Sequence, residues 1–333
     1  MKILSFLLLL ITLVLGDKTM TIASYNVENL FDLDESGYEY QEYIPNSTSK
    51  WNLKNYRTKL KNLSKVIIDI DADIIALQEI ESIKALKDLR KTLKQNGLYY
   101  QYYKIADRKN TTVKVAIFSK IPFVYTKEIS VQSSLRFRNI LESKFIVDDK
   151  SFYIFTNHWK SKSGPESMRI VSAKALLKRI KQIGYEENII LLGDFNSDYE
   201  EYKKFERKRR HNDTNGKTGI NHVLKTISQT SKASEVKYEK NNFYNLWYDR
   251  DKEDRYTYIF RGKKESLDNM LISQPLLDKK GISYINDSMG TLDRKYLYYK
   301  KRINRWYMSG KRPRIHRGKG YSDHLPIVAK FSY

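Results

Sequence analysis

The segment that most constrains the fold of this chain is residues 189–192, four consecutive large apolar side chains followed by Gly193-Asp194-Phe195-Asn196. A run this apolar predicts a strand that is buried on both faces, inside a sheet that is covered on both sides. Alternate residues of a strand point to the same face, so Asp194 and Asn196 share a face if the extended backbone continues. Because glycine, aspartate and asparagine also form ordinary turns, the segment alone leaves a turn as an equal alternative.

Strand and helix patterns alternate along the rest of the chain, which indicates an α/β or α+β fold. Apolar positions that step by three or four residues from Leu53 to Ile67 predict an amphipathic helix. The same reasoning predicts helices at 83–93 and 170–180, strands at 21–27, 74–79, 113–118, 188–192, 267–272 and 326–331, and a hairpin at 145–156 that turns at 148–150. Residues 199–240 are Lys-rich, which predicts surface helices and loops. No internal repeat or Pro/Gly-rich linker is present, so a single domain is expected over 17–333.

The first sixteen residues are typical of a secretory signal peptide. Lys2 precedes an apolar run that ends at the small residue Gly16. The run is too short to span a bilayer comfortably, although a retained anchor stays an alternative. No other run is long and apolar enough to cross a bilayer, so we expect no stable membrane span in the mature chain.

The chain contains no cysteine, which excludes disulfides, thiolate catalysis and cysteine-ligated zinc. Export without disulfides fits a bacterial periplasm or exterior, and we expect a secreted or periplasmic monomer. Lys and Arg total 61 against 39 Asp and Glu, a net charge of +22. Such a charge favours polyanionic partners, either nucleic acid or an anionic membrane surface. A lysine-rich composition that serves only solubility is the alternative.

Polar residues recur where predicted strands end. Strands end at Asn26, at Glu79, at Asn157-His158 and at Asp194, while Asp268 opens a strand and Asp323-His324 precede the last one. Strand ends on one edge of a sheet are where active sites are commonly built. The carboxylates are hard oxygen donors that suit Mg²⁺ or Mn²⁺ with retained water, and a zinc site of His and carboxylate ligands stays open. Carboxylates, amides and imidazoles together fit the attack of water on a phosphodiester.

Six motifs made of these residues occur in the order found in the endonuclease/exonuclease/phosphatase superfamily, which the chain resembles from about Thr21 to Tyr333. They are "YNVENLFD" (25–32), "IIALQEIES" (74–82), "TNHWKSKSG" (156–164), "LLGDFNSD" (191–198), "LDNMLIS" (267–273) and "YSDHLPIVAKF" (321–331). The superfamily includes pancreatic-type deoxyribonuclease, AP endonucleases, neutral sphingomyelinases and inositol-polyphosphate phosphatases. The resemblance implies a deoxyribonuclease I-like, four-layer α/β sandwich of two facing mixed sheets flanked by helices.

The resemblance also implies a role for each matched residue. In the metal site it implies Glu79 as the principal ligand, Asn26 beside it and Asp323 as a second carboxylate, with Mg²⁺ as the ion and Mn²⁺ or Ca²⁺ as alternatives. For catalysis it implies that Asp194 aligns or deprotonates the attacking water beside Asn196, that Asp268 holds the imidazole of His324, and that His158 is a second histidine next to Asn157.

For the substrate, the resemblance implies contacts from Arg138, with Arg136 as the fallback, and from Asn157. One departure concerns His158. Deoxyribonuclease-like members support this histidine with a glutamate, and residues 107–114 contain none. The sequence therefore predicts that His158 lacks its usual orienting partner.

A basic, aromatic segment at 289–320 lies directly before Asp323-His324. It contains eleven Arg or Lys residues, five Tyr or Trp residues and the single acid Asp293. Basic groups contact phosphates and aromatic rings stack on bases, so we expect the segment to grip nucleic acid through residues such as Arg302, Arg305 and Arg312. A solvated loop whose rings pack on the body is the alternative.

Together these features predict a secreted, divalent-metal-dependent nuclease of weak sequence selectivity, acting on DNA and with RNA as a further substrate. A sphingomyelinase- or inositol-phosphate-type phosphoesterase is the main alternative. A polyanion-binding protein that has lost catalysis is a third reading, against which the complete set of catalytic residues counts.

Overall fold

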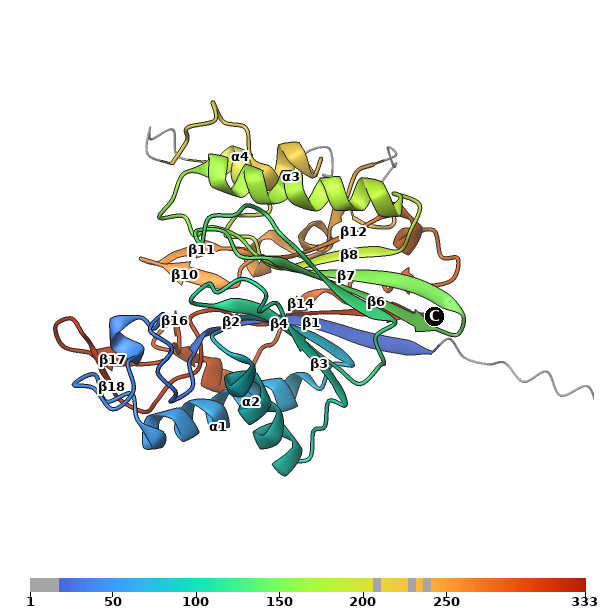
Figure 1. Cartoon of the computed structure of the whole chain (residues 1–333). Helices are drawn as coiled ribbons and strands as arrows, with labels where there is room; N and C mark the ends of the chain where they lie inside the picture. The colour runs from blue at the N-terminus through green and yellow to red at the C-terminus, as the bar shows by residue number, and fades with distance from the viewer. Residues whose placement is uncertain (1–17, 206–210, 227–231, 236–240) are drawn as a thin grey trace, which may run out of the picture.

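The computed structural model describes residues 18–205, 211–226, 232–235 and 241–333, and it confirms the predicted four-layer sandwich (Figure 1). The signal-peptide prediction and parts of the 199–240 segment lie outside these residues. In the part of the chain that is described, no helix is both long enough and apolar enough to cross a membrane.

The first sheet has the strand order β13-β19-β1-β2-β4-β3, and β14 also pairs with β19. Its strands are β1 (Thr19–Leu30), β2 (Ile74–Ile80), β3 (Tyr102–Ile105), β4 (Lys114–Ser119), β13 (Ser283–Tyr284), β14 (Gly290–Thr291) and β19 (Ile327–Ser332). Helices α1 (Leu53–Ile70) and α2 (Ile83–Gln95) cover its outer face (Figure 1).

The second sheet has the order β5-β6-β7-β8-β12-β9 and is covered by α3 (Glu166–Ile183). Its strands are β5 (Tyr125–Ile129), β6 (Ile140–Val147), β7 (Lys150–His158), β8 (Ile189–Asp194), β9 (Tyr244–Asn245) and β12 (Asp268–Ile272). The predicted hairpin is confirmed, because β6 and β7 pair around Asp148 and Asp149, both of which have positive φ.

Three short hairpins and several helical turns complete the described chain. The hairpins are β10 (Tyr258–Phe260) with β11 (Lys263–Glu265), β15 (Tyr298–Tyr299) with β16 (Arg302–Ile303), and β17 (Met308–Ser309) with β18 (Ile315–His316). The turns are η1 (Gln41–Tyr43), α4 (Glu201–Lys204), η2 (Gly219–Val223), η3 (Leu246–Asp249), η4 (Lys252–Asp254), η5 (Gln274–Leu277) and η6 (Lys295–Leu297). The basic segment 289–320 thus contains two hairpins where the sequence suggested a loop.

Three apolar clusters follow the layers and explain the strand patterns. The middle cluster joins inward side chains of both sheets, among them Ile22, Ile74, Ile190 and Met270, all fully buried. The outer clusters join each sheet to its own helices. Strands that pack on both faces need apolar residues at every position, which is why β8 reads as a continuous apolar run.

The strand ends that carry polar residues meet at one edge, which we call the rim. β1 and β2 are parallel, with Asn26 opposite Gln78, and β7 and β8 are parallel, with His158 opposite Asp194. β12 runs antiparallel to β8 and begins with Asp268 opposite Asp194. β19 runs antiparallel to β1, so the segment before it reaches the same edge.

Gly193 is required for β7 and β8 to approach each other at the rim. Its φ is +130°, and a Cβ atom there would lie 2.1 Å from the backbone oxygen of Asn157. We expect Gly193→Ala to destabilise the protein by about 2–4 kcal/mol, because the added carbon meets backbone and the conformation is strained for L residues.

Urea denaturation measures this effect. The matched control is Gly37→Ala, where φ is +82° but a Cβ atom would meet nothing within 4 Å, so only backbone strain of about 1 kcal/mol is expected. Equal losses for the two variants would contradict the close-approach explanation.

Candidate active site

One buried amide, that of Asn26, joins the two sheets at the rim. Its Nδ2 donates to Glu79 Oε1 at 3.3 Å, on the first sheet, and to Asp194 Oδ2 at 3.1 Å, on the second. Its Oδ1 accepts the backbone N–H of Glu28 at 3.0 Å. Asn26 therefore lies between the two carboxylates and orients both of them, and its expected place beside the metal stays a prediction.

A β-bulge aims the Glu79 carboxylate into the rim. The register of β2 shifts between Gln78 and Ile80, and Glu79 has a left-handed φ of 66°. Bulges of this kind re-aim side chains next to active sites. Burial raises the pKa of Glu79, and the nearby charge of Asp323 raises it further.

Asp194 and Asn196 converge through a turn, which corrects the expectation of shared strand geometry. β8 ends at Asp194, and Asn196 has a left-handed φ of 48°. The N–H of Asn196 donates to Asp194 Oδ1 at 2.8 Å, and its Nδ2 donates to Asp194 Oδ2 at 3.0 Å. This is an Asx turn, so the residues that make the turn also make the site. Burial raises the pKa of Asp194 to about 7.

The two histidines of the rim lie in different electrostatic settings. His324 Nδ1 donates to Asp268 Oδ2 at 2.7 Å, which confirms the expected pair. Burial opposes a charge on His324, but Asp268 outweighs it and holds the pKa of this imidazole well above its usual value. His158 Nε2 lies 3.5 Å from Asp194 Oδ2 and 3.7 Å from Glu79 Oε1.

Burial, assisted by the charge of Arg138, holds the pKa of His158 well below its usual value. Its Nδ1 atom is buried, with no hydrogen-bond partner among the described residues, as the missing glutamate predicted. The rim therefore combines a cationic imidazole at His324 with a neutral one at His158. This pair suits phosphoryl chemistry, in which one group accepts or relays a proton and the other stabilises negative charge.

A further carboxylate, that of Glu28, was not predicted from the sequence, although it lies two residues after Asn26. It is buried, and burial raises its pKa to about 7. The guanidinium of Arg305 donates to Glu28 through Nε at 2.9 Å and also through Nη2, and the latter atom lies 3.1 Å from Asp323 Oδ2. Arg305 therefore holds the two carboxylates together while its side chain stays 49% exposed, and its expected contact with the substrate stays a prediction.

The remaining predicted residues divide between buried and exposed positions. Asn157 is fully buried and bonds to Phe155 O and Trp159 Nε1, so it supports the rim without facing it, contrary to expectation. Arg138 is half-buried, and its Nη1 donates to Trp159 O at 3.3 Å. Arg302 and Arg312 are exposed on their hairpins.

The residues at the rim fit a hard divalent cation that keeps most of its water. Among the described residues, no group of three or more His or carboxylate side chains converges as a complete metal cage. Magnesium, however, is commonly held by one or two carboxylates only. The carboxylate of Glu79 is 20% exposed, and among the described residues the one basic group within ion-pair distance is the neutral imidazole of His158, so Glu79 is the group that fits.

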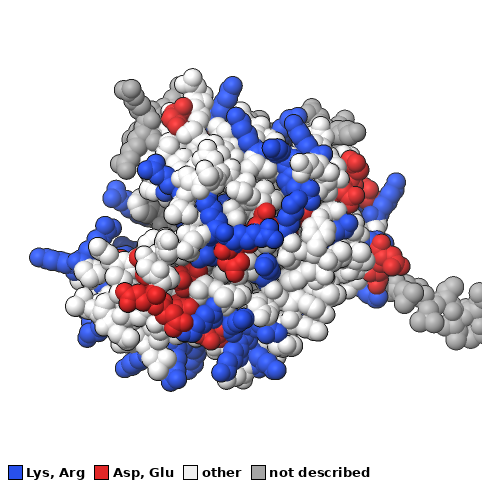
Figure 2. Space-filling view, viewed as in Figure 1, with Lys and Arg blue, Asp and Glu red and all other residues white. Residues whose placement is uncertain are grey.

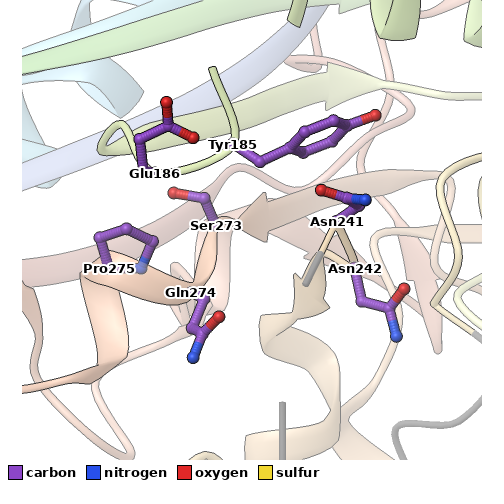
Figure 3. A pocket seen from close by; sticks show the side chains of 7 residues that line it. All are labelled: Tyr185, Glu186, Asn241, Asn242, Ser273, Gln274 and Pro275. Atoms are coloured by element: carbon purple, nitrogen blue, oxygen red, sulfur yellow. The ribbon is translucent and has the colours of Figure 1, made fainter. Parts of the chain in front are cut away.

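A separate hollow lies at the other end of the second sheet (Figure 3). Its lining residues are Tyr185, Glu186, Asn241, Asn242, Ser273, Gln274 and Pro275. Ser273 follows the last residue of β12, whereas Asp268 begins that strand, so the hollow is not part of the rim.

Comparisons with known proteins agree with this architecture. The model of the Endonuclease/Exonuclease/phosphatase family matches residues 21–332. A crystal structure of D. rerio TDP2 humanized by 14 mutations is 15% identical to this chain with a TM-score of 0.57, and the match covers 95% of this chain and 99% of that one. A crystal structure of D. rerio TDP2 complexed with a single-strand DNA product is 14% identical with a TM-score of 0.57, and the match covers 95% of this chain and 100% of that one.

A mannosyl-6-phosphatase from Bacteroides thetaiotaomicron is 15% identical with a TM-score of 0.52, and the match covers 94% of this chain and 100% of that one. At such low sequence identity, these structural similarities show only that the fold is shared. No sequence among curated proteins is significantly similar to this chain.

We expect Glu79→Gln and Asp194→Asn each to lower kcat for phosphodiester hydrolysis by roughly 10²–10⁴-fold with the fold intact, since each removes a charge that the chemistry uses. Hydrolysis of bis(p-nitrophenyl) phosphate, alongside circular dichroism, measures the effect. Glu186→Gln, in the separate hollow, is the matched control and should keep full activity. Full activity in either rim variant would contradict the site.

We expect Arg305→Met to lower the free energy of unfolding by about 2 kcal/mol, because Glu28 would be left buried without its cation. The double variant Glu28→Gln/Arg305→Met should recover most of that loss. A urea double-mutant cycle measures the coupling. Strictly additive effects would show that the two side chains do not depend on each other.

Proposed function

Because the chain belongs to the endonuclease/exonuclease/phosphatase family, whose members are hydrolases of phosphoester bonds, we propose that it is a secreted, Mg²⁺-dependent nuclease that hydrolyses DNA. RNA is included as a further substrate, since contacts to phosphate do not distinguish bases. Secretion rests on the signal-peptide pattern of residues 1–16.

The observation that carries the nuclease proposal is the arrangement of charge around the rim. Acidic groups are concentrated at the centre of the rim, while exposed cations such as Arg302 and Arg312 occupy the adjoining hairpins. Figure 2 shows Lys and Arg spread over both halves of the visible face, with Asp and Glu in smaller patches. A polyanion binds such a surface along its length while one phosphodiester reaches the acidic centre.

The chemistry follows from the protonation states at the rim. Asp194, which accepts hydrogen bonds from Asn26 and Asn196, is positioned to orient the attacking water and take its proton. His324, kept cationic by Asp268, stabilises the charge that develops on the phosphate oxygens or protonates the leaving oxygen. A bound Mg²⁺ held by Glu79 would supply further neutralisation of that charge.

The direct test is incubation of the full chain with supercoiled plasmid and Mg²⁺, with and without a chelator. We expect nicking or degradation only when free metal is present, and none from Glu79→Gln. If plasmid stays intact while choline phosphate is released from sphingomyelin, or phosphate is released from inositol phosphates, the phosphoesterase alternative replaces the nuclease proposal.

We also expect the double variant Arg302→Gln/Arg312→Gln to bind duplex DNA more weakly and with a smaller salt dependence. Each lost phosphate contact lowers the slope of log K against log salt by about 0.9. The matched control is Lys87→Gln/Lys91→Gln, two exposed cations on α2 in the outer helical layer. An equal change in both double variants would mean that only net charge matters, and that the hairpins make no specific contact.

A further inference from the structure

The hairpin β10–β11 is attached directly to the segment of the catalytic imidazole. Tyr258 forms an isolated antiparallel bridge with His324, and Leu325 N donates to Thr257 O at 2.8 Å. Its two turn residues, Arg261 and Gly262, have φ of 49° and 81°, which is a tight turn of the kind that fixes strand register. The position of the hairpin relative to His324 is therefore set by backbone bonds.

Three rings form a row that leads from the catalytic imidazole to the tip of this hairpin. The ring centroid of Tyr258 lies 5.0 Å from that of His324, and Phe260 lies 6.5 Å from Tyr258 with an interplanar angle of 13°. Residues i and i+2 of a strand share a face, so both aromatic rings point the same way. Ile259, on the opposite face, packs against the core. Phe260 is 53% exposed.

A second hairpin, β15–β16, lies against the first and carries another exposed ring. β16 packs against β10, and the hydroxyls of Tyr256 and Tyr298 lie 3.4 Å apart. Tyr299 is 62% exposed, more than any other large apolar or aromatic side chain described. Figure 1 shows both hairpins at the same edge of the molecule, where the polar ends of the strands meet.

Each exposed ring carries its own cation. Arg261 lies over Phe260 at 5.3 Å and Lys300 lies over Tyr299 at 5.6 Å from the ring centroids. Lys263 lies directly across the hairpin from Phe260. Within the described ranges, none of these three cations pairs with a carboxylate.

Rings with adjacent unpaired cations are how proteins bind single-stranded nucleic acid, because bases stack on the rings and phosphates meet the cations. Bases inside a duplex are already stacked on each other and cannot use such a platform. A membrane-binding hairpin would need a larger apolar area than one phenyl ring flanked by Arg261, Lys263 and Lys264.

We propose that the ring of Phe260, at the end of the row from His324 and Tyr258, and the ring of Tyr299, on the neighbouring hairpin, form a stacking platform for unpaired nucleotides next to the scissile phosphate, so that the preferred substrate is single-stranded. This inference rests on the proposed nuclease function and narrows its substrate. Stacking supplies affinity, and the row places the adjacent phosphodiester beside the catalytic imidazole.

The test is fluorescence anisotropy of the full-length protein with a labelled single-stranded oligonucleotide and with the same sequence as a duplex, in a chelator that prevents hydrolysis. We expect tighter binding of the single strand, and a loss of about tenfold for Phe260→Ala and for Tyr299→Ala on the single strand only. Phe260→Trp should keep the affinity of the wild type for the single strand, because an indole ring also stacks on a base. The salt slope should stay unchanged in these variants but fall in Arg261→Gln.

The matched control is Tyr99→Ala, an exposed ring that Arg90 also covers at 4.8 Å. Tyr99 precedes β3, whose first residue, Tyr102, pairs with Ser119 at the end of β4. Ser119 also pairs with Ile74 at the start of β2, which is the end of the sheet opposite the rim. Tyr99 therefore lies away from the rim. This variant should bind like the wild type. If the wild type binds the duplex equally well, or the Phe260 and Tyr299 variants bind normally, the platform is wrong while the nuclease proposal stands.

Failure of the wild type to bind either nucleic acid would overturn the proposed function together with the platform. The same protein is also tested on anionic phospholipid vesicles. Vesicle binding that depends on Phe260, without a single-strand preference, would overturn the platform and assign this hairpin to a membrane surface.

Discussion

The active-site architecture depends on one buried side chain, the amide of Asn26, which links the two sheets. It contacts Glu79 on one sheet and Asp194 on the other, while its oxygen takes the backbone N–H of Glu28. A buried amide with all its groups paired is far more stabilising than one left partly unsatisfied. The two sheets are thereby fixed at the separation that places both carboxylates around one point.

That arrangement concentrates negative charge where water is largely excluded. Burial raises the pKa of Glu79, Asp194 and Glu28, so each carboxylate gains from a nearby cation. For Glu28, that cation is the guanidinium of Arg305, which belongs to the same chain. Within the described part of the chain, no lysine or arginine lies within ion-pair distance of Glu79, which leaves it as the group suited to a divalent ion. The basic hairpins outside this centre then supply the opposite charge that a phosphate backbone requires.

Much of this structure could be predicted from sequence patterns, and the failures have physical causes. Continuous apolar runs predicted the central strands, and the polar residues at their ends predicted the rim. The sequence could not distinguish a strand from the Asx turn at Asn196, because the residue types that form turns are also the types that form the site. The clamp between Glu28 and Arg305 joins positions 277 residues apart, which no local pattern records. Strand β5 was missed because it is a mostly polar edge strand.

The central claim is that Glu79 and Asp194, joined by Asn26, form one cation-dependent phosphodiester site. Anomalous diffraction from crystals grown with Mn²⁺ and a short phosphorothioate oligonucleotide tests it most directly. The account predicts a manganese peak in contact with the Glu79 carboxylate, with a phosphorothioate group between that ion and His324. A peak elsewhere with none at Glu79, or an oligonucleotide bound away from the rim, would contradict it.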